Sequence, residues 1–231
     1  MSWGVLWCAA SLACGQDRNI ATARSDSVKG DTTSPSQSFS VKAPTVVFFG
    51  TSLTAGPGLE PEQAYPVLVE KLAAHDGTPI KAVNAGLSGE TTAGAMRRID
   101  WVLKNPANVV VIETGANDAL RGLSPDSAKS NIEQIVASVK KRQPNAKIAV
   151  IQMEAPPNFG SPYMRRFHAI YGEIAERENV ILMPFLLEGV AGLGTLNQPD
   201  GVHPNAEGEK IVAANVWKSL SPLVQELYSA R

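Results

Sequence analysis

The chain has 231 residues, of which 44% are hydrophobic and 19% are charged, and its formal net charge is −1 at neutral pH. This length and composition are typical of one globular domain with a tail. The balanced charge excludes the basic surplus that drives nucleic-acid binding, and the sequence has no acidic run of the kind that forms a solvated tail.

The amino terminus carries a short apolar run, residues 4–13, that ends at Cys14. The run is too short to span a membrane and has the length of a signal-peptide core. Ser11-Leu12-Ala13-Cys14 looks like a bacterial lipoprotein processing site. We therefore expect residues 1–14 to be a leader and the protein to be exported, as a periplasmic or outer-membrane lipoprotein tethered through lipidated Cys14. The alternative is an unlipidated chain with an apolar amino terminus.

Residues 15–43 are rich in Ser, Thr, Asp and Gly and have few apolar residues, which is typical of a flexible tether. The domain itself is expected at residues 44–231. It contains no cysteine, so we expect no disulfide and no thiolate metal site. Its three histidines, His75, His168 and His203, are scattered, and we expect no metal. His75, in a polar turn, and His168, in mid-helix, are read as surface or packing residues.

From residue 44 onward, apolar runs alternate with amphipathic segments. The expected strands are residues 44–50, 80–83, 108–113, 147–153 and 180–183. The expected helices are residues 61–74, 91–103, 124–142, 162–178 and 204–220. Strands that alternate with helices predict an α/β fold with three layers, in which a five-stranded parallel sheet carries helices on both faces. Strands that are apolar throughout fit a sheet that is buried on both faces.

The first strand leads directly into Gly50-Thr51-Ser52. In an open α/β sheet, the carboxyl ends of the strands are where ligands and chemistry collect. A serine on a tight turn at this edge is a candidate nucleophile. The alternative is an ordinary turn that happens to contain serine.

A candidate base for this serine is His203, which lies just before the last predicted helix. A serine hydroxyl becomes a good nucleophile when a base takes its proton, and histidine suits that task near neutral pH. Asp200, three residues earlier, can fold back onto one ring nitrogen and leave the other facing the serine. The alternative is a capping histidine that follows an aspartate turn.

Attack on an acyl carbon creates an oxyanion, which needs preorganised hydrogen-bond donors. Gly89, after the second strand, can bring its backbone N–H close to a substrate because it has no side chain. The side chain of Asn117, after the third strand, and the N–H of Ser52 are further candidate donors. Taken singly, Gly89 and Asn117 fit equally well with plain turns.

Four short motifs occur in the order of the sequence blocks of the SGNH (GDSL) hydrolases: Gly50-Thr51-Ser52-Leu53, Gly89, Gly115-x-Asn117-Asp118 and Asp200-x-x-His203. The chain resembles this family over about residues 46–223, and within it the bacterial thioesterase I, lysophospholipase L1 and arylesterase group. The resemblance implies a catalytic triad of Ser52, Asp200 and His203. It also implies an oxyanion hole from Ser52, Gly89 and Asn117, a flavodoxin-like strand order 2-1-3-4-5, and no cofactor.

One residue departs from the family pattern, because Thr51 stands where the family has aspartate. Threonine can hydrogen-bond the turn but brings no charge, which affects the positioning of Ser52 rather than the mechanism. The chain has no Gly-x-Ser-x-Gly elbow, which argues against the α/β-hydrolase fold. The resemblance also points to apolar residues that would wall a substrate pocket, although core packing explains them equally well: Met153, Phe159, Leu186 and Leu187.

The sequence therefore predicts a serine esterase or thioesterase that hydrolyses short- to medium-chain acyl esters through an acyl-enzyme. Its partner would be a small-molecule acyl ester or thioester, with no nucleic acid. A first alternative is a carbohydrate O-acetyl esterase, which the predicted export favours. A second is a lipid-anchored binding module with a degenerate site, whose support is Thr51.

Overall fold

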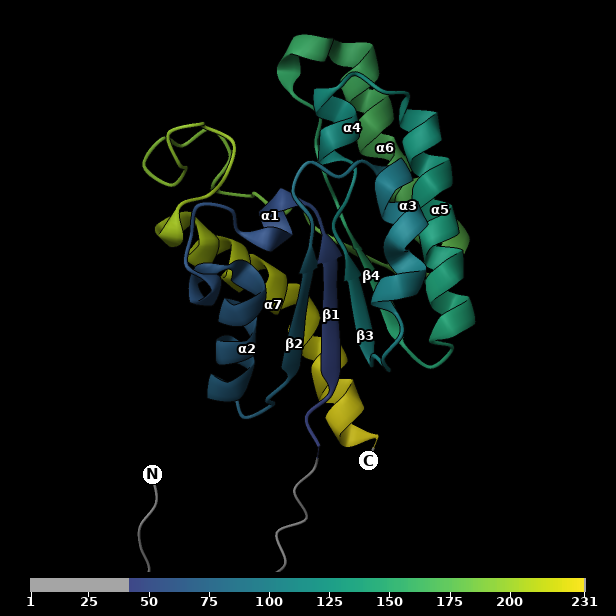
Figure 1. The fold of residues 1–231 in the computed structure, drawn as a ribbon, viewed down its shortest axis with the longest axis vertical. Coiled ribbons are helices and arrows are strands. Elements are labelled where there is room, and N and C mark those ends of the chain that lie inside the picture. The colour runs from purple at the N-terminus through teal and green to yellow at the C-terminus, as the bar shows by residue number, and fades with distance from the viewer. Residues whose placement is uncertain (1–41, 231) are drawn as a thin grey trace, which may run out of the picture. The chain divides into compact units, whose positions relative to one another are not determined.

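The computed structural model describes residues 42–230, which build a five-stranded parallel sheet in the order β2-β1-β3-β4-β5. This order and the α/β architecture confirm the predicted fold (Figure 1). The strands are β1 (Thr45–Gly50), β2 (Lys81–Gly86), β3 (Val109–Ile112), β4 (Lys147–Ile151) and β5 (Ile181–Met183). The predicted leader, and all but the last two residues of the predicted tether, lie outside the described residues.

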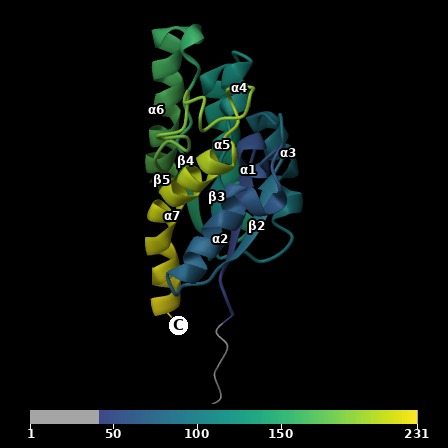
Figure 2. The ribbon, with the colours of Figure 1, turned by 90° about the vertical axis from the view of Figure 1, so that its left-hand side faces the viewer.

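Helices cover both faces of this sheet. They are α1 (Ser52–Ala55), η1 (Pro61–Gln63), α2 (Tyr65–His75), α3 (Thr92–Val102), α4 (Ala116–Leu120), α5 (Pro125–Arg142), η2 (Pro157–Phe159), α6 (Ser161–Glu178) and α7 (Ala206–Ser229). Figure 1 shows α2 and α7 on one face and α3, α5 and α6 on the other. Figure 2 looks onto the first face, where α2 and α7 lie side by side. Between residues 42 and 230, no helix is long and apolar enough to cross a membrane.

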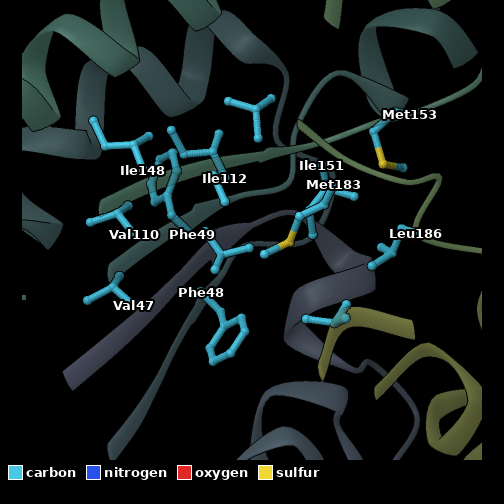
Figure 3. Packing of buried hydrophobic residues seen from close by; sticks show 14 of the residues in the cluster. Val47, Phe48, Phe49, Val110, Ile112, Ile148, Ile151, Met153, Met183 and Leu186 are labelled. Atoms are coloured by element: carbon cyan, nitrogen blue, oxygen red, sulfur yellow. The ribbon is translucent and has the colours of Figure 1, made fainter. Parts of the chain in front are cut away.

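The core lies on both sides of the three central strands. Phe48 and Phe49 point to opposite faces from β1, as successive residues of a strand do, and both are fully buried (Figure 3). The residues of β3 and most of β4 are also buried, as expected for strands covered by helices. The edge strands differ, because β2 and β5 are half-exposed along most of their length. The prediction of full burial therefore holds for the centre of the sheet and fails at its edges.

The predicted helix at residues 61–74 is two helices, η1 and α2. Ala64 separates them with extended backbone angles, φ −64° and ψ 139°. Pro66 explains the break, because it has no N–H to continue the hydrogen bonding of a preceding helix and is tolerated in a first turn. Three short elements at the strand ends, α1, α4 and η2, are too brief to leave a periodic pattern in the sequence.

The last helix begins later and ends later than the predicted range of residues 204–220. Asn205 caps it, since its side chain accepts hydrogen bonds from the N–H groups of Glu207 and Gly208, and Pro204 pairs with Asn197 in an isolated β-bridge. The helix continues to Ser229 through Pro222. Val224, beyond this proline, is fully buried, and its packing accounts for the extra turns.

We expect Gly86→Ala to destabilise the fold, because β2 passes against the turn that follows β1. A Cβ atom on Gly86 would lie 2.3 Å from the backbone nitrogen of Ala55 and 2.8 Å from the carbonyl oxygen of Thr51. Backbone atoms cannot move aside as a flexible side chain can, so the expected loss is about 3 kcal/mol of unfolding free energy. Chemical denaturation would measure this loss.

Gly172→Ala in α6 is the matched control, since its new Cβ would meet nothing within 4 Å. Alanine favours a helix interior, so this variant should gain about 0.5–1 kcal/mol. Equal stability of Gly86→Ala and the wild type would show that the β2 contact is not as tight as the structure has it.

Candidate active site

Ser52 is the first residue of α1, directly beyond the carboxyl end of β1. Its Oγ lies 2.8 Å from Nε2 of His203, although the two residues are 151 positions apart in the chain. The turn between strand and helix is closed by hydrogen bonds from the N–H groups of Ala55 and Gly56 to the carbonyl oxygens of Thr51 and Ser52. The structure thus brings the predicted nucleophile and base into contact.

Asp200 holds the other side of the histidine ring. Its Oδ2 lies 2.7 Å from Nδ1 of His203, while its Oδ1 accepts hydrogen bonds from the backbone N–H groups of Val202 and His203. Hydrogen bonds from the backbone and ring of His203 lower the pKa of Asp200 to about 2. A carboxylate that stays ionised here favours the tautomer with a proton on Nδ1, which leaves Nε2 free to accept a proton from Ser52.

Local hydrogen bonds shape the loop that carries His203. The carbonyl oxygen of His203 accepts a hydrogen bond from the N–H of Gln198 at 2.7 Å. The side chain of Gln198 donates to the carbonyl oxygens of Pro204 and Pro57. Pro57 lies just beyond α1, so Gln198 fastens the histidine loop to the segment that follows Ser52. No local sequence pattern predicts this contact, which joins residues 141 positions apart.

The candidate oxyanion donors sit on the loops beyond β2 and β3. Gly89 has φ of +74°, a conformation that favours glycine, and its carbonyl oxygen accepts a hydrogen bond from Arg121. Nδ2 of Asn117, on α4, donates to the carbonyl oxygen of Glu90 at 3.1 Å. An amide nitrogen has two hydrogens, so one remains for another acceptor. These contacts place the loop of Gly89 directly against Asn117.

Thr51, the departure from the family pattern, contacts the carboxyl group of Glu113, which no sequence motif assigns to the site. The Thr51 backbone N–H and hydroxyl both donate to Glu113, which follows β3, and the Thr54 hydroxyl donates to the same group. Glu113 is fully buried, and burial raises its pKa. The position of Glu113 at the end of an apolar strand could have indicated its role, since a charged residue that is buried there needs hydrogen-bond partners.

A second buried carboxylate, Glu209, lies in the first turn of α7. Its Oε2 accepts a hydrogen bond from the backbone N–H of Tyr65 at 2.7 Å, which joins the start of α7 to the start of α2. Burial raises the pKa of Glu209 to about 8. The hydroxyl of the same tyrosine lies 3.0 Å from Oγ1 of Thr54, so the two carboxylates belong to one buried polar network.

The four predicted pocket residues fall into different environments. Met153 and Leu186 are buried in the core, and Leu187 packs against it. Phe159 is half-exposed and packs against Tyr163, with ring centroids 5.2 Å apart. Leu186 also lines a cavity of about 340 Å³ between the β5 edge and α7, and none of the three residues of the predicted triad lines it. The role of Met153, Phe159, Leu186 and Leu187 as walls of a substrate pocket stays a prediction.

The other two histidines lie on the surface. The side chain of His75 is 86% exposed beside Asp76, and that of His168 is 63% exposed with Nδ1 2.6 Å from Glu154. Neither belongs to the cluster around Ser52. Within residues 42–230, no group of three or more His, Cys, Asp or Glu side chains is placed to hold a metal ion.

A parallel α/β/α sheet with a Ser-His-Asp cluster at its carboxyl edge is the architecture of a serine hydrolase. The profile of the GDSL-like Lipase/Acylhydrolase family matches residues 48–211, and the chain belongs to this family. Its relatives include Esterase TesA of Pseudomonas aeruginosa, which is 38% identical over 79% of this chain and 90% of that protein. Thioesterase 1/protease 1/lysophospholipase L1 of Escherichia coli is 34% identical over 79% of this chain and 86% of that protein.

Solved structures of esterases are also similar to this chain. The crystal structure of TesA matches 78% of this chain and 99% of its own, with a TM-score of 0.73 and 36% identity. The psychrotrophic esterase EstA from Pseudoalteromonas sp., inhibited by monoethylphosphonate, matches 79% of this chain and 99% of its own. Its TM-score is 0.74 at 31% identity. The arylesterase of Vibrio mimicus is a further relative, with 33% identity over 76% of this chain.

Proposed function

We propose that the protein is a serine esterase or thioesterase that hydrolyses short- to medium-chain acyl esters through an acyl-enzyme. The observation that carries this proposal is the continuous contact from Ser52 to His203 to Asp200, at 2.8 and 2.7 Å. Relatives that are named esterase, arylesterase and thioesterase 1/lysophospholipase L1 support the same reaction class.

In the proposed first half-reaction, Nε2 of His203 accepts the Ser52 proton as Oγ attacks the acyl carbon. The negative charge that develops on the carbonyl oxygen is stabilised by the N–H groups of Ser52 and Gly89 and by Nδ2 of Asn117. Collapse of the tetrahedral intermediate breaks the bond to the alcohol or thiol, and His203 returns the proton to that leaving group. Asp200 keeps the ring oriented and stabilises its cationic form.

In the second half-reaction, water takes the place of the alcohol. His203 accepts a proton from the water as its oxygen attacks the acyl-enzyme, and the same donors stabilise the second oxyanion. The ester bond to Ser52 then breaks, and His203 returns the proton to the serine. The products are a carboxylic acid and the free enzyme, and every proton is accounted for by one imidazole.

An acyl-length profile separates this proposal from a carbohydrate O-acetyl esterase. We expect p-nitrophenyl butyrate and octanoate to be hydrolysed at least as well as the acetate, measured as kcat/KM. A steep preference for acetate over octanoate would instead favour the O-acetyl esterase. No covalent labelling of Ser52 by a fluorophosphonate would favour the binding module.

We also propose export and lipidation at Cys14. The support is the residue pattern Ser11-Leu12-Ala13-Cys14, which lies outside the described residues. Metabolic labelling with radioactive palmitate, compared between the wild-type chain and Cys14→Ser, tests it. Label in the wild type alone supports lipidation, and equal label in both contradicts it.

A further inference from the structure

A partly buried ion pair joins the Gly89 loop to helix α3. Glu90 follows Gly89, and Nε of Arg98, on α3, donates to both of its carboxylate oxygens at 2.8 Å. The side chains of Glu90 and Arg98 are 7% and 19% exposed, and charged side chains reach such low exposure mainly when they are paired. Gly94 makes room for it, because a Cβ atom there would lie 2.9 Å from Cγ of Glu90. The sequence is thus arranged to admit this pair.

The same arginine reaches the turn that carries Ser52. Nη2 of Arg98 donates to the carbonyl oxygen of Gly50 at 3.1 Å, and the N–H of Leu87 donates to the same oxygen at 2.9 Å. The guanidinium also lies 4.4 Å from the ring centroid of Phe49. One planar group therefore fixes the end of β1, two residues before Ser52, relative to the loop that holds Gly89.

The main chain of Glu90 also contacts Asn117, the third candidate oxyanion donor. Its carbonyl oxygen accepts the hydrogen bond from Nδ2 of Asn117. Glu90 consequently binds Asn117 through its backbone and Arg98 through its side chain. The segments that carry Ser52, Gly89 and Asn117 come from three separate strand ends, and all of them meet at these two residues.

We infer that Glu90 and Arg98 are positioning residues that set the geometry of the oxyanion hole. The inference rests on the proposed function and adds two residues that act through the Ser52 turn, the Gly89 loop and Asn117. Stabilisation of an oxyanion depends on donors that are already in place, and small displacements of reacting groups lower rates strongly. An ion pair that is partly withdrawn from water carries a desolvation cost that an apolar contact between the loop and the helix would avoid.

The test compares Glu90→Gln and Arg98→Lys with the wild type. The first keeps the shape of the side chain and one acceptor but loses the charge. The second keeps the charge but loses the planar fork that reaches Glu90 and Gly50 together. The control is Arg142→Lys, which disturbs the exposed pair between Arg142 and Asp100 that fastens the same helix, α3, to α5.

Four quantities are measured: kcat and KM for p-nitrophenyl butyrate, the inhibition constant of a butylboronic acid, and the thermal unfolding midpoint. A boronic acid forms a tetrahedral adduct with the serine and places an oxygen in the oxyanion hole. We expect kcat to fall about 10–100-fold in Glu90→Gln and Arg98→Lys, with KM within about threefold of the wild type. The inhibition constant should rise by a similar factor, and Arg142→Lys should stay within about twofold in all kinetic values.

Two results would overturn the inference. One is a kcat within twofold of the wild type in both site variants. The other is a loss of activity that matches the unfolded fraction at the assay temperature, with unchanged boronate affinity in the folded fraction. If one variant does not fold, the other decides by the same criteria. Failure of the proposed function is distinct, because the wild type would then be no faster than Ser52→Ala.

Discussion

Replacement of Ser52 by alanine is expected to lower kcat for p-nitrophenyl butyrate by about 10⁴–10⁶-fold. The variant keeps His203 and Asp200 in place but has no oxygen to form the acyl-enzyme. Ser52 is partly exposed and the side chain of its partner His203 is 24% exposed, so loss of this contact should leave the fold intact. Steady-state kinetics measure the loss, and thermal unfolding checks that the variant is folded.

Ser130→Ala is a suitable control, because Ser130 lies on the exposed side of α5. It should hydrolyse the ester at the wild-type rate. A fluorophosphonate should add to Ser52 in the wild type and in this control, but not in Ser52→Ala, which mass spectrometry of the peptide would show. Equal turnover by Ser52→Ala and the wild type would end the hydrolase assignment at this site.

Replacement of His203 by alanine should lower kcat by at least about 10³-fold, because within residues 42–230 its ring nitrogen is the hydrogen-bond partner of the Ser52 hydroxyl and the group placed to take its proton. The nucleophile remains, so fluorophosphonate labelling should become slow rather than absent. Added imidazole should restore part of the activity, since the ring of His203 is 24% exposed and its removal leaves an accessible space. Progress curves with and without imidazole measure both effects.

His168→Ala is the matched control, since this histidine also has Nδ1 against a carboxylate, that of Glu154. In the part of the chain that the structure describes, no hydrogen bond joins His168 to a serine, and its replacement should leave kcat unchanged. If His203→Ala retained more than a tenth of the wild-type kcat, or if His168→Ala lost as much, another group would have to be the base.

Most of the fold follows from local patterns. The apolar runs locate all five strands, and β1 begins within one residue of its predicted start. Amphipathic spacing locates the long helices, and the Ser124 cap marks the start of α5. The break at Ala64 and the extension of α7 through Pro222 depend on tertiary packing, which overrides local preference at single residues.

Local sequence patterns also predict part of the candidate active site. Asp200 and His203 are three residues apart, and a short turn must bring them together. Glu113 and Glu209 act across 62 and 144 residues of sequence, respectively, so no local spacing could reveal their partners. Apolar residues such as Leu186 are ambiguous by nature, because a core and a pocket wall use the same side chains.

The buried carboxyl of Glu209 makes folding a proton-uptake reaction at neutral pH. Its pKa is about 8 in the native protein and near 4.5 in an unfolded chain, so between these values the native state holds a proton that the unfolded state releases. The free energy of unfolding should therefore fall as pH rises from about 4.5 to 8, by roughly 2–4 kcal/mol from this group. Urea titrations at pH 5 and pH 8 should show that slope in the wild type and a shallower one in Glu209→Gln. The contact between α2 and α7 therefore stores a proton, and mild acidity stabilises the folded domain that carries the candidate active site.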